Sequence, residues 1–279
     1  MSQGKDLYSP APAAALKATT TTTATTGKTS SLVWPPTHRF AKTAEEAITR
    51  FKELAHKEAS SANGWTEINR AKDVIVTKQA SDVPLGVLRG DGVIKGYNTF
   101  ECYAVSAFPS CRKVWDELFE DGKPVENLDD STILSYASTK GQFPVSGRDM
   151  AVLLISDFNL DGRIYCVSVS VVDPQIPAAK GKVRANLKLN GWYLEPLVGE
   201  KGTRVVYISE IDLNGSIPGA ILNVFIFSFF FLANSKRCSH YYFYYSWSRK
   251  RCPWSLPTSA STSHAAGHRR SLTALVRPS

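Results

Sequence analysis

The sequence predicts an α+β domain built on a strongly curved antiparallel β-sheet. Residues 183–190 alternate apolar and polar side chains, a Gly-containing turn follows at 197–202, and a second set of alternate positions comes after it: Val205, Tyr207, Ser209 and Ile211. A period of two is typical of strands with one buried and one solvated face. The chain before this hairpin contains further short strand-like runs separated by Gly and Pro, after one amphipathic helix. These observations indicate that the upstream strands complete the sheet to which the hairpin belongs.

The first element that we expect is a helix over residues 43–59. Thr43 and Glu46 have the spacing of a capping box. Asn63-Gly64 then breaks the helical pattern. The apolar residues between them recur at helical spacing: Ala44, Ala47, Ile48, Phe51, Leu54 and Ala55.

Strands follow the helix, with a short helix opened by Pro109 among them. Asp157–Gly162 resembles the first half of a calcium loop, but the twelfth position is Ser168 instead of Glu. Its place between two strands favours a hairpin turn. The strand-like runs are Trp65–Asn69, Asp73–Gln79, Val87–Lys95, Phe100–Ala107, Thr132–Thr139, Asp149–Ser156 and Arg163–Val172.

Composition divides the 279 residues into three parts. Residues 1–37 are rich in Ala, Thr, Ser and Pro and predict a disordered leader. Residues 38–224 predict the folded domain. The net charge of +8 belongs to the end of the chain, because eight Lys and Arg and no acid follow Asp212, which leaves 25 basic residues (33 minus 8) against 25 acidic ones. Residues 225–279 form an atypical basic, aromatic-rich tail without helical or strand periodicity.

Two interpretations of this tail stay open. The abrupt loss of acids and of periodicity favours a non-native or disordered segment, such as a retained intron or a shifted reading frame. The apolar run at 219–233 is the basis of the other interpretation, membrane attachment. As a helix it would measure about 22 Å, which is short of the ~30 Å hydrocarbon core. Nucleic-acid binding is less favoured than either.

The sequence contains few residues or motifs that are typical of catalysis. His38 and His56 are the only histidines before the tail, and there is no HExxH, P-loop or Gly-x-Ser-x-Gly motif. The five cysteines form no CxxC pair, and their odd number argues against a disulfide framework. We therefore expect no metal, no cofactor and no enzymatic activity. With no secretory signal at the N-terminus, we expect a cytoplasmic protein.

Four linked motifs closely resemble the START domain, the lipid-transfer module related to steroidogenic acute regulatory protein. The resemblance covers about residues 38–224. It implies a helix-grip fold, in which a curved antiparallel sheet and a C-terminal lid helix enclose a hydrophobic tunnel for one lipid. The motifs are Phe143-Pro-Val-Ser-Gly-Arg-Asp149, Ser170-Val-Val-Asp-Pro174, Gly181-Lys-Val-Arg-Ala185 and Asp212-Leu-Asn-Gly-Ser-Ile-Pro218.

The resemblance implies a monomeric carrier of one lipid, a sterol or another neutral or polar lipid, that contacts membrane surfaces transiently and remains peripheral to them. Family members that carry steroids have a buried acid and an arginine where this chain has Ser135 and Leu154, so both halves of that ion pair are absent. The ceramide-carrying member has a tyrosine that matches Tyr207. Two alternatives are kept: a small-molecule enzyme on the same scaffold, and a lipid-sensing adaptor held on a membrane by the Phe-rich tail.

The expected pocket is mostly apolar. Arg148 and Asp149 match the family's Arg-Asp pair and are expected to brace the strand entry or to contact the head group. Glu210 alternates with Tyr207 and is expected to point away from the pocket. The predicted lipid-binding residues are Ser135, Ala137, Val152, Leu154, Ser168, Tyr207, Ser209, Ile221 and Leu222.

Overall fold

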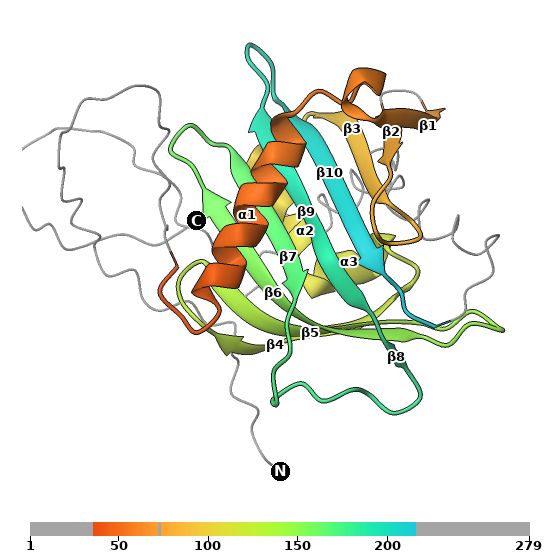
Figure 1. Ribbon diagram of the computed structural model, residues 1–279. Helices are drawn as coiled ribbons and strands as arrows, with labels where there is room; N and C mark the ends of the chain where they lie inside the picture. Colours follow the sequence, from red (N-terminus) through yellow and green to blue (C-terminus); the bar gives the residue numbers. More distant parts are fainter. Residues whose placement is uncertain (1–35, 72–73, 216–279) are drawn as a thin grey trace, which may run out of the picture.

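The computed structural model describes residues 36–71 and 74–215 of the chain (Figure 1). The predicted tail and the pocket residues Ile221 and Leu222 lie outside the described residues, as does nearly all of the leader.

A ten-stranded sheet forms the body of the described residues, in the order β1-β2-β3-β10-β9-β7-β6-β5-β4, with β8 paired in parallel to β6. All other pairs are antiparallel. The helices are α1 (Ala41–His56), α2 (Thr99–Ala107) and α3 (Pro109–Trp115), with the short η1 (Ser61–Asn63). The strands are β1 (Trp65–Ala71), β2 (Val74–Gln79), β3 (Val87–Lys95), β4 (Phe119–Asn127), β5 (Thr132–Thr139), β6 (Arg148–Phe158), β7 (Ile164–Ser170), β8 (Val183–Arg184), β9 (Asn186–Pro196) and β10 (Gly202–Asp212).

Helix α1 covers one face of the sheet and confirms the first predicted element. Its apolar stripe, which includes Ile48 and Phe51, is fully buried against β6, β7, β9 and β10. Gly191 of β9 lies below this helix, where an added Cβ would stand 2.8 Å from the Phe51 ring. The close approach of helix and strand therefore requires glycine at this position.

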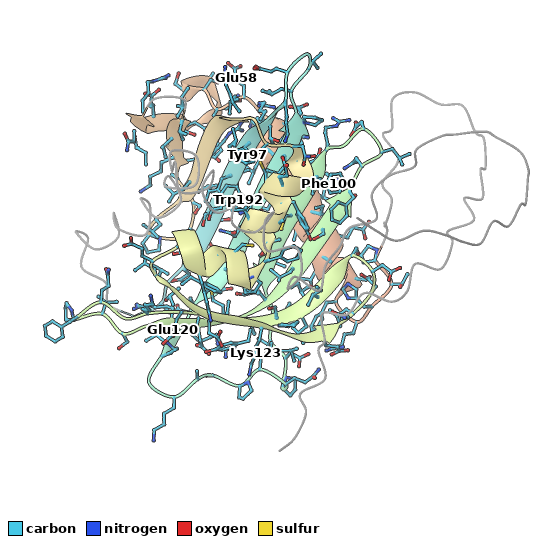
Figure 2. The ribbon with its side chains drawn as sticks, turned by 180° about the vertical axis from the view of Figure 1, so that it is seen from behind. Glu58, Tyr97, Phe100, Glu120, Lys123 and Trp192 are labelled. Atoms are coloured by element: carbon cyan, nitrogen blue, oxygen red, sulfur yellow. The ribbon has the colours of Figure 1, made fainter. Side chains whose placement is uncertain are left out.

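Helices α2 and α3 lie on the opposite face, and Figure 2 shows them in front of the sheet when the molecule is seen from behind. The prediction of a strand at Phe100–Ala107 is wrong, because this segment is α2. A capping box starts the helix: the Asn98 side chain accepts from the Glu101 N–H at 2.9 Å, and Glu101 accepts from the Asn98 N–H at 2.6 Å. Two satisfied helix-end donors outweigh a weak strand-like pattern.

Strand β4 was not predicted from the sequence. It contains Gly122 and Pro124, which are uncommon inside strands, and only Phe119 is buried within it. Both residues are tolerated because β4 is the edge of the sheet and pairs only with β5. The edge position explains why the sequence pattern there is weak.

The prediction that one face of the final hairpin is solvated is also wrong. Val206 and Ile208 are fully buried under α1, and Val205 and Tyr207 are buried on the other face. A bulge at Lys188 shifts the register, since Ile211 pairs with Leu187 while Glu210 pairs with Leu189. Leu187 therefore faces the same side as α3, whereas Leu189 faces α1.

Candidate functional site

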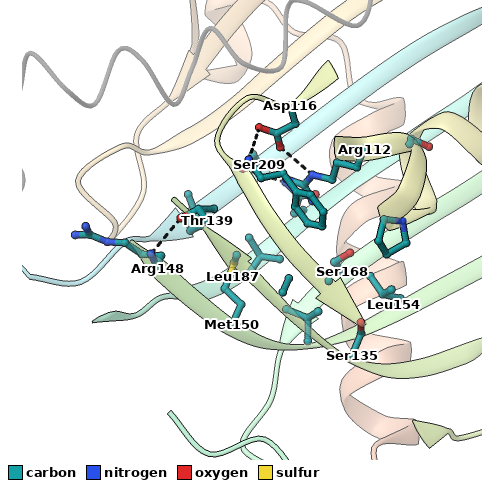
Figure 3. Close-up of a pocket in the computed structure, with 18 of the residues that line it drawn as sticks. Arg112, Asp116, Ser135, Thr139, Arg148, Met150, Leu154, Ser168, Leu187 and Ser209 are labelled. Atoms are coloured by element: carbon teal, nitrogen blue, oxygen red, sulfur yellow. Dashed lines mark hydrogen bonds and ion pairs between the residues drawn. The ribbon is translucent and has the colours of Figure 1, made fainter. Parts of the chain in front are cut away.

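A pocket lies between the sheet and the helices α2 and α3 (Figure 3). It contains about 1250 Å³ of space free of atoms, counting its opening to solvent. The apolar part of its lining comes from seven strands, from α2 and α3, and from the segments next to these elements. These residues are Leu85, Leu88, Ala107, Pro109, Leu118, Phe119, Ala137, Met150, Val152, Leu154, Cys166, Leu187, Trp192, Ile211 and Leu213.

The structure brings six of the predicted lipid-binding residues together in this lining: Ser135, Ala137, Val152, Leu154, Ser168 and Ser209. Tyr207 lies on the same face of the sheet but does not line the pocket, because it is packed beside Trp192 at 4.5 Å between ring centres. Glu210 lies on the α1 face and forms an ion pair with Arg50, so it does point away from the pocket.

A row of three polar side chains crosses the pocket wall. Strand register places Ser168 of β7 directly opposite Asn190 of β9, and Asn190 directly opposite Ser209 of β10. We call these three residues the polar row. Leu154 stands opposite Ser168 at one end, and Leu88 stands opposite Ser209 at the other. Polar groups therefore occupy the middle of an otherwise apolar wall.

The Asn190 amide connects the polar row with Tyr207. Its Nδ2 donates to the Tyr207 hydroxyl and, at 3.3 Å, to Ser209 Oγ. Burial raises the pKa of the Tyr207 phenol, since hydrogen bonds from its neighbours offset only part of the desolvation. The phenol therefore stays protonated and acts as a neutral hydrogen-bonding group.

Arg112 and Asp116 supply an ion pair at the α3 side of the pocket (Figure 3). Arg112 Nε donates to Asp116 Oδ2 at 2.9 Å, and the guanidinium lies 5.0 Å from the centre of the Phe119 ring. Asp116 Oδ1 also accepts the backbone N–H groups of Leu118 and Phe119 at 3.2 Å each. The carboxylate is thus satisfied by protein donors, and the pair is electrically neutral.

Arg148 lines the end of the pocket where the chain leaves β10. Its guanidinium donates to three backbone carbonyls: Leu213 at 3.1 Å, Ser146 at 2.6 Å and Asn214 at 2.9 Å. The bonds to Leu213 and Asn214 tie the start of β6 to the segment that follows β10.

Asp149 does not line the pocket and is fully buried. Its carboxylate accepts from Arg184 at 2.8 Å and from the Ala179 N–H at 2.9 Å. Burial favours the protonated acid, but these donors outweigh it and lower the pKa of Asp149 below its usual value. Asp149 therefore anchors the loop before β8 to β6.

Sequence reasoning missed Asn190, Arg112 and Asp116. Asn190 occupies a position that simple alternation assigns to the solvated face, and only the bulge at Lys188 reveals its true direction. The ion pair is visible in the sequence as an i, i+4 spacing across the end of α3, but the spacing does not say which way it faces.

The family model described as "START domain" matches residues 45–240 of the chain. The chain belongs to the START domain family. Its relatives include StAR-related lipid transfer protein 5 of cattle, which is 27% identical over 169 residues covering 58% of this chain and 79% of the relative. START domain-containing protein 10 of the mouse is 27% identical over 112 residues, covering 40% of this chain and 38% of that protein.

Solved structures agree with the predicted helix-grip fold of START domains. Human StAR-related lipid transfer protein 5 superposes with a TM-score of 0.65 at 24% identity, over 72% of this chain and 97% of that one. Human STARD10 gives a TM-score of 0.63 at 21% identity, over 74% and 83%. Within the described residues of this START domain, no helix is long and apolar enough to cross a bilayer.

Proposed function

We propose that this START domain binds a single lipid in the pocket and carries it between membranes without covalent chemistry. The observation that carries the proposal is the pocket lining, in which apolar side chains from seven strands face the space between the sheet and the helices α2 and α3. Each methylene of a lipid chain that leaves water for such a site contributes about 0.8 kcal/mol. A chain of ordinary length therefore supplies enough free energy to hold the cargo during passage through water.

The cargo that fits this lining is a sterol or another neutral or polar lipid. Ser135 and Leu154, which lie on neighbouring strands, replace the acid and arginine of steroid-carrying family members. The Ser135 hydroxyl donates to the Lys123 carbonyl at 2.9 Å, so it is turned toward the backbone of β4. Selectivity therefore has to come from other polar groups in the wall.

The ionisable groups in and beside the pocket favour a carrier over the enzyme alternative. Burial raises the pKa of the Cys166 thiol to about 12, which keeps it from forming a nucleophilic thiolate at neutral pH. Asp116 is held by Arg112 and two backbone N–H groups, and the Tyr207 phenol stays neutral. None of these groups is poised to transfer a proton to a substrate.

Transfer requires contact with a membrane, and Phe143 is the side chain best placed for it. Phe143 is fully exposed in the loop between β5 and β6, and the residues that flank this loop, Thr139 and Arg148, line the pocket. We therefore infer that the protein touches membranes transiently through this loop, and we propose that it does so as a monomer in the cytoplasm. The adaptor alternative depends on the tail at 225–279, which lies outside the described residues.

Native mass spectrometry of the purified chain after incubation with mixed-lipid vesicles tests the proposal. We expect one lipid mass per protein, and we expect that lipid to appear in acceptor vesicles at a rate that rises with protein concentration. A chain that stays free of lipid at every vesicle composition would contradict the proposal. Membrane association lost on deletion of residues 225–279, with no transfer, would favour the adaptor instead.

A further inference from the structure

The hydrogen bonds of the polar row leave two groups available to a ligand. Asn190 Nδ2 is used by Tyr207 and Ser209, but Asn190 Oδ1 and the Ser168 hydroxyl make no hydrogen bond to any described residue. The other hydroxyls of the lining are engaged: Ser135 and Ser106 donate to backbone carbonyls, and Thr139 accepts the Arg148 N–H at 3.1 Å. The wall thus presents one acceptor and one hydroxyl side by side on adjacent strands.

The side chains on either side of these two groups are apolar. The charge of Arg112 is balanced by Asp116, and the Arg148 guanidinium, which keeps its positive charge, donates to backbone carbonyls at the pocket's end. Cys166 and Trp192 lie next to the polar row on one side. Leu187 and Ile211 lie on its other side. A ligand group that reaches the polar row must therefore be small and uncharged, and the parts of the ligand on either side of it must be apolar.

We propose that the polar row recognises a hydroxyl or amide group of the cargo, so that the pocket selects an uncharged hydrogen-bonding lipid over fully apolar or anionic lipids. A lipid hydroxyl can donate to Asn190 Oδ1 and accept from the Ser168 hydroxyl, which satisfies both groups at once. A lipid without such a group leaves them buried and unpaired, and an anion would face the Asn190 carbonyl oxygen. This inference rests on the proposed function and names its substrate class.

The test offers the wild-type chain matched lipids in one vesicle population and measures uptake by native mass spectrometry. The pairs are cholesterol with cholest-5-ene, which lacks the hydroxyl, and dioleoylglycerol with its acetyl ester; oleate is the anionic probe. We expect at least one hydroxyl-bearing lipid to bind, about tenfold better than its partner and better than oleate. Equal uptake within each binding pair, or a preference for oleate, would overturn the inference while leaving a lipid carrier. Uptake of no lipid at all would overturn the proposed function as well.

Variants assign the selectivity to the polar row. Ser168→Ala removes an unpartnered hydroxyl and should reduce the preference severalfold with little effect on folding. Asn190→Leu should abolish the preference while keeping the uptake of the apolar partner. Asn186→Leu is the matched control, because Asn186 lies on the same strand but is exposed and outside the pocket. A preference that survives Ser168→Ala and Asn190→Leu unchanged would contradict the assignment.

Discussion

Leu154 is the residue at which a single charge most directly tests the apolar pocket. It lines the pocket on β6, two positions from Val152, whose partner across the ladder is Ser135. Leu154→Arg places a cation in the wall, where its cross-strand partners Ile133 and Ser168 carry no charge to pair with it. We expect lipid uptake to fall at least tenfold and the free energy of unfolding to fall by about 3 kcal/mol. Vesicle extraction and urea denaturation measure the two effects.

The double variant Ser135→Asp with Leu154→Arg is the control for this experiment. An acid on the neighbouring strand is within reach of the long arginine side chain, so the pair should recover at least about 1 kcal/mol of the loss. Unchanged lipid uptake in Leu154→Arg would show that the lipid does not lie against this wall.

Asp149 predicts a pH dependence of stability. Because its folded pKa lies below the usual value of about 3.9, its contribution is fully present above that pH and is lost as the pH falls through the folded pKa. At pH 7, Asp149→Asn should cost about 3 kcal/mol, since it leaves Arg184 without its buried partner. Urea denaturation should show a constant difference in the free energy of unfolding between variant and wild type from pH 7 to about 5. This difference should become smaller below about pH 4.

Arg184→Met provides the matching half of a double-mutant cycle with Asp149. The double variant should cost much less than the sum of the two single variants, because each single change already breaks the same pair. A gap between Asp149→Asn and wild type that stays constant down to pH 3 would assign the stabilisation to packing instead of charge.

At the residue scale, sequence reasoning located the pocket wall better than its chemistry. Ser209 was predicted from its alternate position with Val205 and Tyr207, Ser168 was predicted from the resemblance to the START family, and the structure places both in the lining. Asn190, which lies between them, was assigned to the solvated face because the alternation from Ala185 onward was taken as unbroken. A one-residue bulge reverses every side chain beyond it, and nothing in the local sequence marks Lys188 as the extra residue.

At the scale of the elements, helices and strands with strong periodicity were predicted correctly, whereas the edge strand was missed. Helix α1 and the strands β5, β6, β7 and β10 carry long apolar patterns, and each lies where the sequence predicts it. Strand β4 has one neighbour and little burial, so its sequence is weakly constrained. Helix α2 was mistaken for a strand because its capping residues were overlooked, although Asn98 and Glu101 were visible in the sequence.

Helix α2 lies beside the pocket, and its capping box allows a prediction about the stability of this helix. Asn98→Ala removes the acceptor for the Glu101 N–H and should lower the free energy of unfolding by about 1 kcal/mol. Asn98→Asp retains an acceptor and should be nearly neutral. Chemical denaturation compares the two variants, and hydrogen exchange of the α2 amides locates the change. Equal loss in both variants would mean that the amide nitrogen of Asn98, and not the cap, stabilises the helix.

At the scale of the whole molecule, the body of the chain up to Asp212 carries no net formal charge, so long-range attraction to an anionic membrane is not built into it. Contact with a bilayer then depends on exposed apolar side chains. Phe143 and Val198 are both fully exposed, but antiparallel pairing places them at opposite ends of the strands: Phe143 lies before β6 begins, and Val198 lies between β9 and β10. Of these two loops, it is the Phe143 loop that is flanked on both sides by pocket residues.

Phe143→Ser should therefore slow lipid transfer between vesicles severalfold, because the loop loses the apolar group that enters the interface beside the pocket. Lipid uptake at equilibrium and the free energy of unfolding should stay unchanged, since Phe143 is exposed and makes no core contact. Val198→Ser is the matched control and should transfer lipid at the wild-type rate. Equal slowing in both variants would indicate that surface apolarity in general drives membrane contact. Slowing by Val198→Ser alone would place the docking surface at the far end of the strands, so that cargo would enter by a route other than the Phe143 loop.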